Sequence, residues 1–295
     1  MEPLNRDLKP VRDSEQPFEA QPCPGAGWPH VEDGEIRRKI ENLRLILLKK
    51  VGPGYGLGHV TPEHAGTGQS SVSVLEIEDA TEATTEYGRC LVIEKDLVDC
   101  PSPERLTEAH RVLRGVGGDG GGAGGLVFLD LETTGLSATP LFLAGMLVER
   151  GRRLKAVQLL ARDYAEERCL IGILDGLLAD CRICVTFNGK SFDLPYLKER
   201  AKYHRLPLRA APEQLDLLHH ARRRWKHHLP DCRLLTLEWH ILGRRRIGDV
   251  DGWEVPCIYH EFVHTRDPRR LKGVLRHNLM DVLAMAELLV SLAEA

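Results

Sequence analysis

A segment composed mostly of glycine, GVGGDGGGAGG at 115–125, divides the 295-residue chain into two parts. Such a segment offers few side chains to a core and leaves the backbone free, so we predict a flexible linker. It contains the pattern GxGxxG, which cradles a pyrophosphate only where it follows a strand and opens a helix. Here the pattern precedes an apolar, strand-like run, which argues against nucleotide binding.

The part before the linker shows weak organisation. Residues 1–34 are rich in proline and have no hydrophobic period, so we expect them to be disordered. We predict a small helix and hairpin extension over 35–114, with strands at 71–78 and 88–97 and a short helix capped by Ser102. Its first helix would place one apolar face along Ile36, Ile40, Leu43 and Leu47.

The part after the linker, 126–295, alternates strand and helix patterns. LVFLDLE, LFLAGMLVERG and RLKAVQLLA follow one another closely enough to form an antiparallel meander, and CRICVTFNG predicts a fourth strand. An amphipathic helix precedes the fourth strand, and further helices are expected at 192–205, 213–226, 232–241 and 269–293. The predicted fold class is therefore α/β, with a mixed sheet flanked by helices.

Composition excludes several classes of protein. No apolar run approaches the roughly 18–20 residues of a membrane-spanning helix, and no secretory signal is visible. Eight cysteines are too few for a disulfide scaffold in this length and suit a reducing compartment. Residues 126–295 carry 26 Lys and Arg against 22 Asp and Glu, whereas 1–125 carry 14 against 21. We predict a soluble, cytoplasmic protein without a membrane partner, whose C-terminal part is the one suited to a polyanion.

Acidic side chains recur at the ends of two predicted strands and within the last predicted helix. Asp130 and Glu132 lie two apart in LVFLDLE and therefore share one face of that strand. Asp193 follows the fourth strand, and His277 and Asp281 lie one turn apart on the last helix. Paired carboxylates repel one another unless a cation compensates, so the first pair predicts a divalent metal site.

Three segments, LDLETTGL, NGKSFD and HNLMDV, resemble in order the signature segments of the DEDD (DnaQ-like) exonuclease branch of the ribonuclease H-like superfamily. The chain looks most similar to the YprB-like group of predicted exonucleases. Three of its segments, DLLHHARRRW, CRLLTLEWHILG and GDVDGWEVPCIYHEF, resemble the intervening segments of that group. The resemblance covers about 126–295, which would form one ribonuclease H-like exonuclease domain.

The resemblance implies a hydrolase that cleaves nucleic-acid phosphodiesters with two Mg²⁺ or Mn²⁺ ions, as a 3′–5′ exonuclease on single-stranded DNA or RNA. The ions would be held by Asp130, Glu132, Asp193 and Asp281. His277 would either deprotonate the attacking water or only position it. It stands four residues before Asp281, a spacing that the tyrosine branch of the superfamily uses, whereas the histidine branch uses five.

The resemblance also implies a set of substrate contacts: Thr133, Thr134, Gly135, Leu136, Asn188, Lys190, Phe192, Asp216 and Arg222. Asp216 would act either beside the site or as a helix cap. Arg222–Arg224 with Lys226, and Arg244–Arg246, are candidate phosphate contacts or solvated faces. Tyr196 and Trp225 would stack on bases or pack in the core.

Two other functions compete with the nuclease interpretation. HEFVH at 260–264 matches HExxH, the zinc-hydrolase pattern, although prolines bracket the segment closely. A ribonuclease H-like fold with a dead site would instead be a nucleic-acid-binding scaffold. Cys181 and Cys184 form one CxxC pair, for which a core position is the simpler explanation.

Overall fold

The computed structural model describes residues 77–97, 100–115, 125–135, 139–150, 153–190 and 192–295. The predicted disordered segment 1–34, the helix expected from residue 35 and nearly all of the glycine-rich linker lie outside these residues. Among the described residues, no helix has both the length and the apolar character that crossing a membrane requires.

A seven-stranded mixed sheet forms the centre of the described part. The strands are β1 (Ala80–Thr85), β2 (Gly88–Asp96), β3 (Leu126–Thr133), β4 (Leu141–Arg150), β5 (Arg153–Leu160), β6 (Ile183–Thr186) and β7 (Glu213–Asp216). Their order is β1-β2-β5-β4-β3-β6-β7. The first five strands in this order pair antiparallel, whereas β6 and β7 run parallel to β3. The predicted meander and fourth strand are confirmed.

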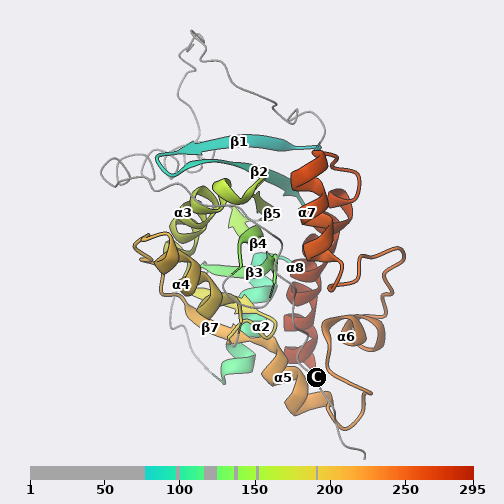
Figure 1. Ribbon diagram of the computed structural model, residues 1–295. Coiled ribbons are helices and arrows are strands. Elements are labelled where there is room, and N and C mark those ends of the chain that lie inside the picture. Colours follow the sequence, from blue (N-terminus) through green and yellow to red (C-terminus); the bar gives the residue numbers. More distant parts are fainter. Residues whose placement is uncertain (1–76, 98–99, 116–124, 136–138, 151–152, 191) are drawn as a thin grey trace, which may run out of the picture. The chain divides into compact units, whose positions relative to one another are not determined.

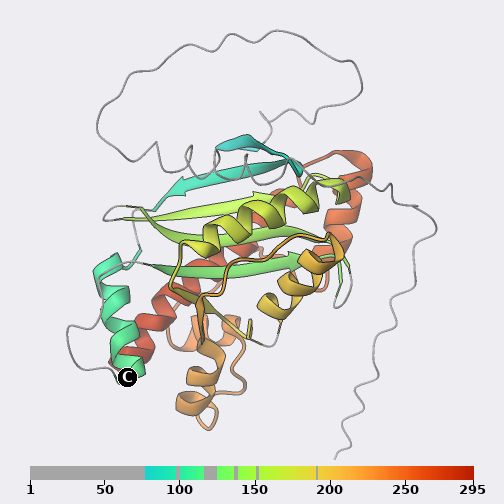
Figure 2. The same ribbon diagram turned by 90° about the vertical axis from the view of Figure 1, so that its left-hand side faces the viewer.

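Helices cover both faces of this sheet. They are α2 (Pro103–Arg114), α3 (Glu167–Ala179), α4 (Asp193–Tyr203), α5 (Leu217–Trp225), α6 (Leu234–His240), α7 (Val255–Thr265) and α8 (Leu271–Glu294), with a 3₁₀ turn at Tyr164–Glu166. Helix α3 crosses one face of the sheet and α8 the other (Figure 2). The strands between them are buried on both sides, and eight consecutive residues of β4 are inaccessible to solvent.

The hairpin before the linker belongs to the same sheet, because β2 pairs with β5 from Leu91 opposite Leu160 to Asp96 opposite Lys155. Its second strand lies where the sequence predicts it, whereas the first is Ala80–Thr85 rather than 71–78. The predicted cap is confirmed, since Ser102 accepts a hydrogen bond from the backbone N–H of Arg105 at the start of α2. The division of the chain into 35–114, 115–125 and 126–295 stays a prediction.

The helix predicted over 213–226 is wrong at its beginning. Residues 213–216 form β7, and the helix begins only at Leu217. The parallel ladder with β6, from Ile183 opposite Glu213 to Thr186 opposite Asp216, satisfies the backbone of these four residues. That ladder depends on a partner strand some 30 residues earlier, so the local pattern does not reveal it.

Candidate functional site

Asp130 and Glu132 lie side by side near the end of β3, the strand between β4 and β6. Their side chains point to the face that α8 covers, and both are half-buried. In the register of β3 and β4, Asp130 lies opposite Gly145. The predicted pair thus lies on one face of a central strand, under the longest helix.

Asp193 is the first residue of α4 and follows the turn that leaves β6. Because β6 is parallel to β3, this turn lies at the end of the sheet where β3 also ends. The backbone N–H of Leu131 donates to Asp193 Oδ1 at 3.2 Å, which holds the carboxylate against β3. The turn is tight: Asn188 has a φ of 66°, and a side chain at Gly189 would collide with Asp193 and Thr186.

Asn278 joins α8 to the acidic strand. Its Nδ2 donates to Asp130 Oδ2 at 2.8 Å and to the Asp130 carbonyl oxygen at 3.2 Å. Its Oδ1 accepts from Gln158 Nε2 at 2.8 Å. Asp130, Gly145 and Gln158 are cross-strand neighbours on β3, β4 and β5, so Asn278 lies over Gly145 between two polar residues. This row of four residues is called the polar row below.

His277 and Asp281 lie one turn apart on α8, and a second group of side chains fixes both. Asp249, in the segment between α6 and α7, lies 3.0 Å from His277 Nδ1 through its Oδ2. Arg246 donates to Asp281 Oδ1 at 2.5 Å, to Asp249 Oδ2 at 3.1 Å and to Glu238 Oε2 at 2.6 Å. Because a carboxylate only accepts hydrogen bonds, the proton of a neutral His277 stays on Nδ1, next to Asp249. The other ring nitrogen, Nε2, lies 3.6 Å from Asp281 Oδ2 and is free to accept a proton.

Asp249, Arg246 and Asn278 are site residues that sequence reasoning did not identify. Arg246 is predicted as a phosphate contact, but the structure buries its guanidinium among three carboxylates. Asp249 lies in GDVDGWE, a segment quoted only for its resemblance, and Asn278 follows His277 in the third signature segment. In the sequence, only their position within or beside those segments could have pointed to Asp249 and Asn278, because no residue spacing reveals their roles.

The carboxylates act on one another electrostatically. The pKa of Asp130 is raised well above its usual range, first by burial and then by the charges of Asp281, Glu132 and Asp193. Burial, Asp281 and Asp193 raise the pKa of Glu132 to about 8. Burial also raises the pKa of Asp193 to about 7, although its hydrogen bond from Leu131 opposes the shift. The four predicted metal ligands therefore share one region of negative potential, which a cation would stabilise.

The donor set fits a hard divalent cation, because every predicted ligand offers carboxylate oxygens. Protein donors hold one oxygen in each of Asp130, Asp193 and Asp281, which orients these carboxylates. As the side chains stand, no three His, Cys, Asp or Glu residues within the described ranges converge closely enough to form a metal site. Binding of a cation would therefore require these carboxylates to move closer together, and Asp281 Oδ2 is the oxygen that Arg246 leaves available.

Asp216 organises the turn that carries Asp193. Its two carboxylate oxygens accept from the backbone N–H groups of Asn188, at 2.8 Å, and Lys190, at 3.1 Å. Asp216 Oδ1 also accepts from the N–H of Leu218 and caps α5. Asp216 thus serves as a helix cap and as the anchor of the turn, and two predicted substrate contacts, Asn188 and Lys190, are held through their backbones.

The remaining predicted substrate contacts lie mainly in the loop after β3. Thr133 Oγ1 donates to the carbonyl of Gly135 at 2.7 Å, and Thr134 Oγ1 donates to that of Pro140 at 3.3 Å. Leu136 is outside the described residues. Phe192 contacts the buried ring of Tyr196, whereas Arg222 is exposed on α5. The loop and Phe192 therefore adjoin the carboxylates, and Tyr196 belongs to the core.

The HExxH pattern does lie on a helix, α7, but its side chains have separate partners. His260 Nδ1 is 2.6 Å from the hydroxyl of Tyr164, and His264 Nδ1 is 2.7 Å from a backbone carbonyl. Glu261 forms an ion pair of 2.6 Å with Arg270. These contacts do not support the zinc-hydrolase alternative.

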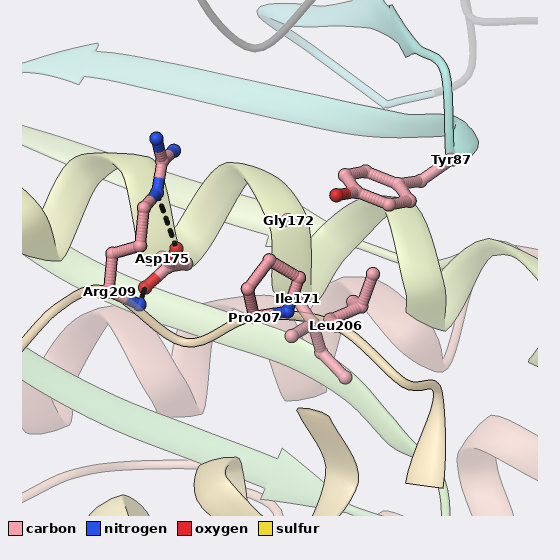
Figure 3. Close-up of a pocket in the computed structure, with 7 residues that line it drawn as sticks. All are labelled: Tyr87, Ile171, Gly172, Asp175, Leu206, Pro207 and Arg209. Atoms are coloured by element: carbon pink, nitrogen blue, oxygen red, sulfur yellow. Dashed lines mark hydrogen bonds and ion pairs between the residues drawn. The ribbon is translucent and has the colours of Figure 1, made fainter. Parts of the chain in front are cut away.

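A cavity of about 280 Å³ lies on the α3 side of the sheet (Figure 3). Its walls are largely apolar and include Tyr87, Ile171 and Leu206. The one carboxylate there, Asp175, accepts from the backbone N–H of Arg209 at 2.9 Å and lies 3.6 Å from the Arg209 guanidinium. Its polar groups thus serve the packing of the 204–213 loop on α3, away from the acidic residues under α8.

Comparison with known proteins identifies the family. A family model described as the RNase_H superfamily matches residues 127–293, from β3 to the end of α8. The chain belongs to the RNase_H superfamily. The predicted ribonuclease H-like α/β fold is thereby confirmed, and the superfamily supports a nuclease as the class of function.

Two individual proteins are also similar to this chain. The uncharacterized protein YprB of Bacillus subtilis (strain 168) is 38% identical over 176 residues, which are 57% of this chain and 42% of YprB. The chain therefore spans less than half of that relative. The structure of the family B DNA polymerase from the hyperthermophilic archaeon Pyrobaculum calidifontis matches with a TM-score of 0.45 and 18% identity, over 58% of this chain and 27% of the polymerase.

Proposed function

We propose that this protein is a metal-dependent nuclease that removes nucleotides from the 3′ end of single-stranded DNA or RNA in the cytoplasm. The observation that carries the proposal is that four acidic side chains from three elements lie near enough to raise one another's pKa: Asp130 and Glu132 on β3, Asp193, which binds the Leu131 N–H, and Asp281 on α8. Buried like charges destabilise a fold unless they have a partner. A superfamily that includes nucleases and this carboxylate set together favour phosphodiester hydrolysis.

Asp130, Glu132, Asp193 and Asp281 would hold the two Mg²⁺ or Mn²⁺ ions. When bound, such ions lower the pKa of water and stabilise charge on the phosphate oxygens. The protein's contribution is orientation: Asn278, the Leu131 N–H and Arg246 each fix one carboxylate before any ligand arrives. Because these side chains are already oriented, less conformational entropy is lost when the ions bind.

His277 would take the proton of the attacking water. Asp249 keeps the Nδ1 proton in place, so Nε2 is the nitrogen that accepts. The water oxygen then bonds to phosphorus while the bond to the 3′-oxygen breaks, releasing a nucleoside 5′-monophosphate and a strand with a new 3′-hydroxyl. The 3′-oxygen takes its proton from solvent, and His277 releases the proton that it accepted from the attacking water to solvent.

Cleavage of end-labelled single-stranded DNA and RNA tests the proposal. The full chain is incubated with Mg²⁺, Mn²⁺, Zn²⁺ or EDTA, beside Asp130→Asn and a matched variant of an exposed acid, Asp267→Asn. We expect a ladder from the 3′ end with Mg²⁺ or Mn²⁺, unchanged in Asp267→Asn and absent in Asp130→Asn. Equal activity of Asp130→Asn, or activity only with Zn²⁺, would refute the two-metal site. Binding without cleavage by the wild type would instead identify an inactive scaffold.

A further inference from the structure

A second depression lies next to the acidic site, on the side of the segment between α6 and α7. It has a volume of about 260 Å³, and its lining includes Arg244, Arg245, Ile247, Arg276 and Met280. Figure 1 shows this segment looping outward beside α8. The lining is thus built from a loop on one side and a flank of α8 on the other.

This depression continues into the candidate active site. Arg246 and Asp249 line it, and the same two side chains contact Asp281 at 2.5 Å and His277 at 3.0 Å. On α8, Arg276 immediately precedes His277, so its side chain projects about 100° around the helix from the histidine. A strand lying in the depression would therefore pass beside the side chains that contact Asp281 and His277.

The arginines of the depression differ in their partners. Arg246 is neutralised by three carboxylates, and Arg244 forms an ion pair of 2.9 Å with Glu287. Arg245 and Arg276 are exposed, and neither forms an ion pair with a carboxylate in the described part of the chain; Arg276 Nη1 donates to the Ile247 carbonyl at 3.5 Å. Two positive charges are therefore available to an anion at the rim of the site.

Aromatic surface accompanies these charges. Trp239 on α6 is 56% exposed, and the Arg245 guanidinium lies over its ring at 5.3 Å from the centroid. Ile247 and Trp253, in the following loop, are 83% and 74% exposed. Exposed indole rings next to arginines that have no carboxylate partner are a combination that binds single-stranded nucleic acid, through base stacking and phosphate contact.

We infer that Trp239, Arg245 and Arg276 form a binding site for the single strand upstream of its reacting end. Trp239 stacks on a base, while Arg245 and Arg276 contact backbone phosphates. This inference rests on the proposed function only for the direction of the strand; the binding itself does not require cleavage. Duplex ends bind less tightly, because paired bases do not offer their faces to the indole.

Fluorescence anisotropy with labelled oligodeoxynucleotides and oligoribonucleotides in EDTA tests the site without turnover. We expect Trp239→Ala to weaken binding of the single strand about tenfold or more, and Trp239→Phe to retain most of it. The matched control is Tyr203→Ala, because Tyr203 is 53% exposed and also has an arginine, Arg200, over its ring at 4.4 Å. Tyr203→Ala should leave the Kd unchanged.

The salt dependence separates phosphate contacts from stacking. Arg245→Gln and Arg276→Gln should each lower the slope of log Kd against log salt by roughly 0.7, whereas Trp239→Ala leaves the slope unchanged. Arg153→Gln, at the exposed first residue of β5, is the control. The inference is wrong if Trp239→Ala binds like Tyr203→Ala, or if the slopes do not change.

The outcomes distinguish this site from the proposed activity. Wild-type protein that binds through Trp239 but never cleaves supports the binding site and refutes the nuclease. Cleavage that is insensitive to all three substitutions supports the nuclease and overturns the binding site. An abasic position moved along the oligonucleotide should abolish the effect of Trp239→Ala at one place only, which gives the distance of the stacked base from the 3′ end.

Discussion

Replacing Gly145 with alanine should break the polar row that links α8 to Asp130. A methyl group at this position would lie 2.6 Å from Asn278 Cγ and 2.8 Å from Asn278 Nδ2, closer than carbon tolerates. The Asn278 side chain would have to swing away or α8 would have to rise from the sheet. Either movement removes the bonds of Asn278 to Asp130 and Gln158, both 2.8 Å long.

The magnitude follows from those two bonds. A hydrogen bond to a carboxylate contributes about 1.5–3 kcal/mol and a neutral one about 0.5–1.5 kcal/mol, so we expect Gly145→Ala to cost about 2–4 kcal/mol. For a chain of this size that corresponds to a fall in Tm of roughly 5–15 °C. An Asn278→Ala background removes the three atoms nearest to the methyl group, and there the same substitution should cost less than about 1 kcal/mol.

Urea unfolding of the two single variants and the double variant measures the difference. The coupling free energy between positions 145 and 278 should exceed about 1.5 kcal/mol. Gly252→Ala is the matched control, because a methyl group there meets no atom within 4 Å. If Gly145→Ala destabilises equally with and without Asn278, the collision is not the cause and the polar row does not join helix to sheet.

Three further predictions concern the site and its support. Asp249→Asn should lower kcat about 10-fold to 100-fold with little change in KM, because His277 loses its orientation; a change confined to KM would contradict this role. Mn²⁺ should raise the Tm of the wild type but not of Asp130→Asn, and an equal rise in both would exclude ligation there. Burial alone would raise the pKa of Glu167, but hydrogen bonds from Arg200 and His204 lower it overall. The ionised Glu167 therefore stabilises the fold fully above about pH 4.5, the pKa of a free glutamate, and this stabilisation is lost as the pH falls through the lowered pKa of the folded protein. Glu167→Gln should therefore cost about 3–5 kcal/mol at neutral pH and flatten the loss of Tm in acid; an unchanged acid profile would contradict it.

The acidic residues could be predicted from sequence because each lies in or next to a strongly patterned element. The apolar run before Asp130 and the helical stripe around Asp281 set the strand and the helix without reference to the rest of the fold. Their meeting still depended on a resemblance, since periodicity does not say which strand and which helix are neighbours. The role of each of these residues stays a prediction until the activity is measured.

Two of the residues whose place in the site sequence reasoning did not predict lie where no period exists. Asp249 and Arg246 belong to the irregular segment between α6 and α7, and only the folded chain brings them to His277 and Asp281. Asp216 was predicted, either beside the site or as a helix cap, but its position at the end of a four-residue strand depends on the ladder with β6. A short strand and an irregular loop gain their structure from tertiary contacts, which a local pattern does not contain.

The pairing of β2 with β5 affects how the protein can be truncated without exposing the edge of its sheet. A chain beginning at residue 126 would keep every predicted ligand but would leave β5 as an open edge strand, with its N–H and C=O groups unpaired on one side. All five residues from Ala156 to Leu160 of that strand are buried in the full chain, and four of them are apolar. Two such fragments could pair along it, so aggregation of a shortened protein would report the missing hairpin rather than a defect of the site.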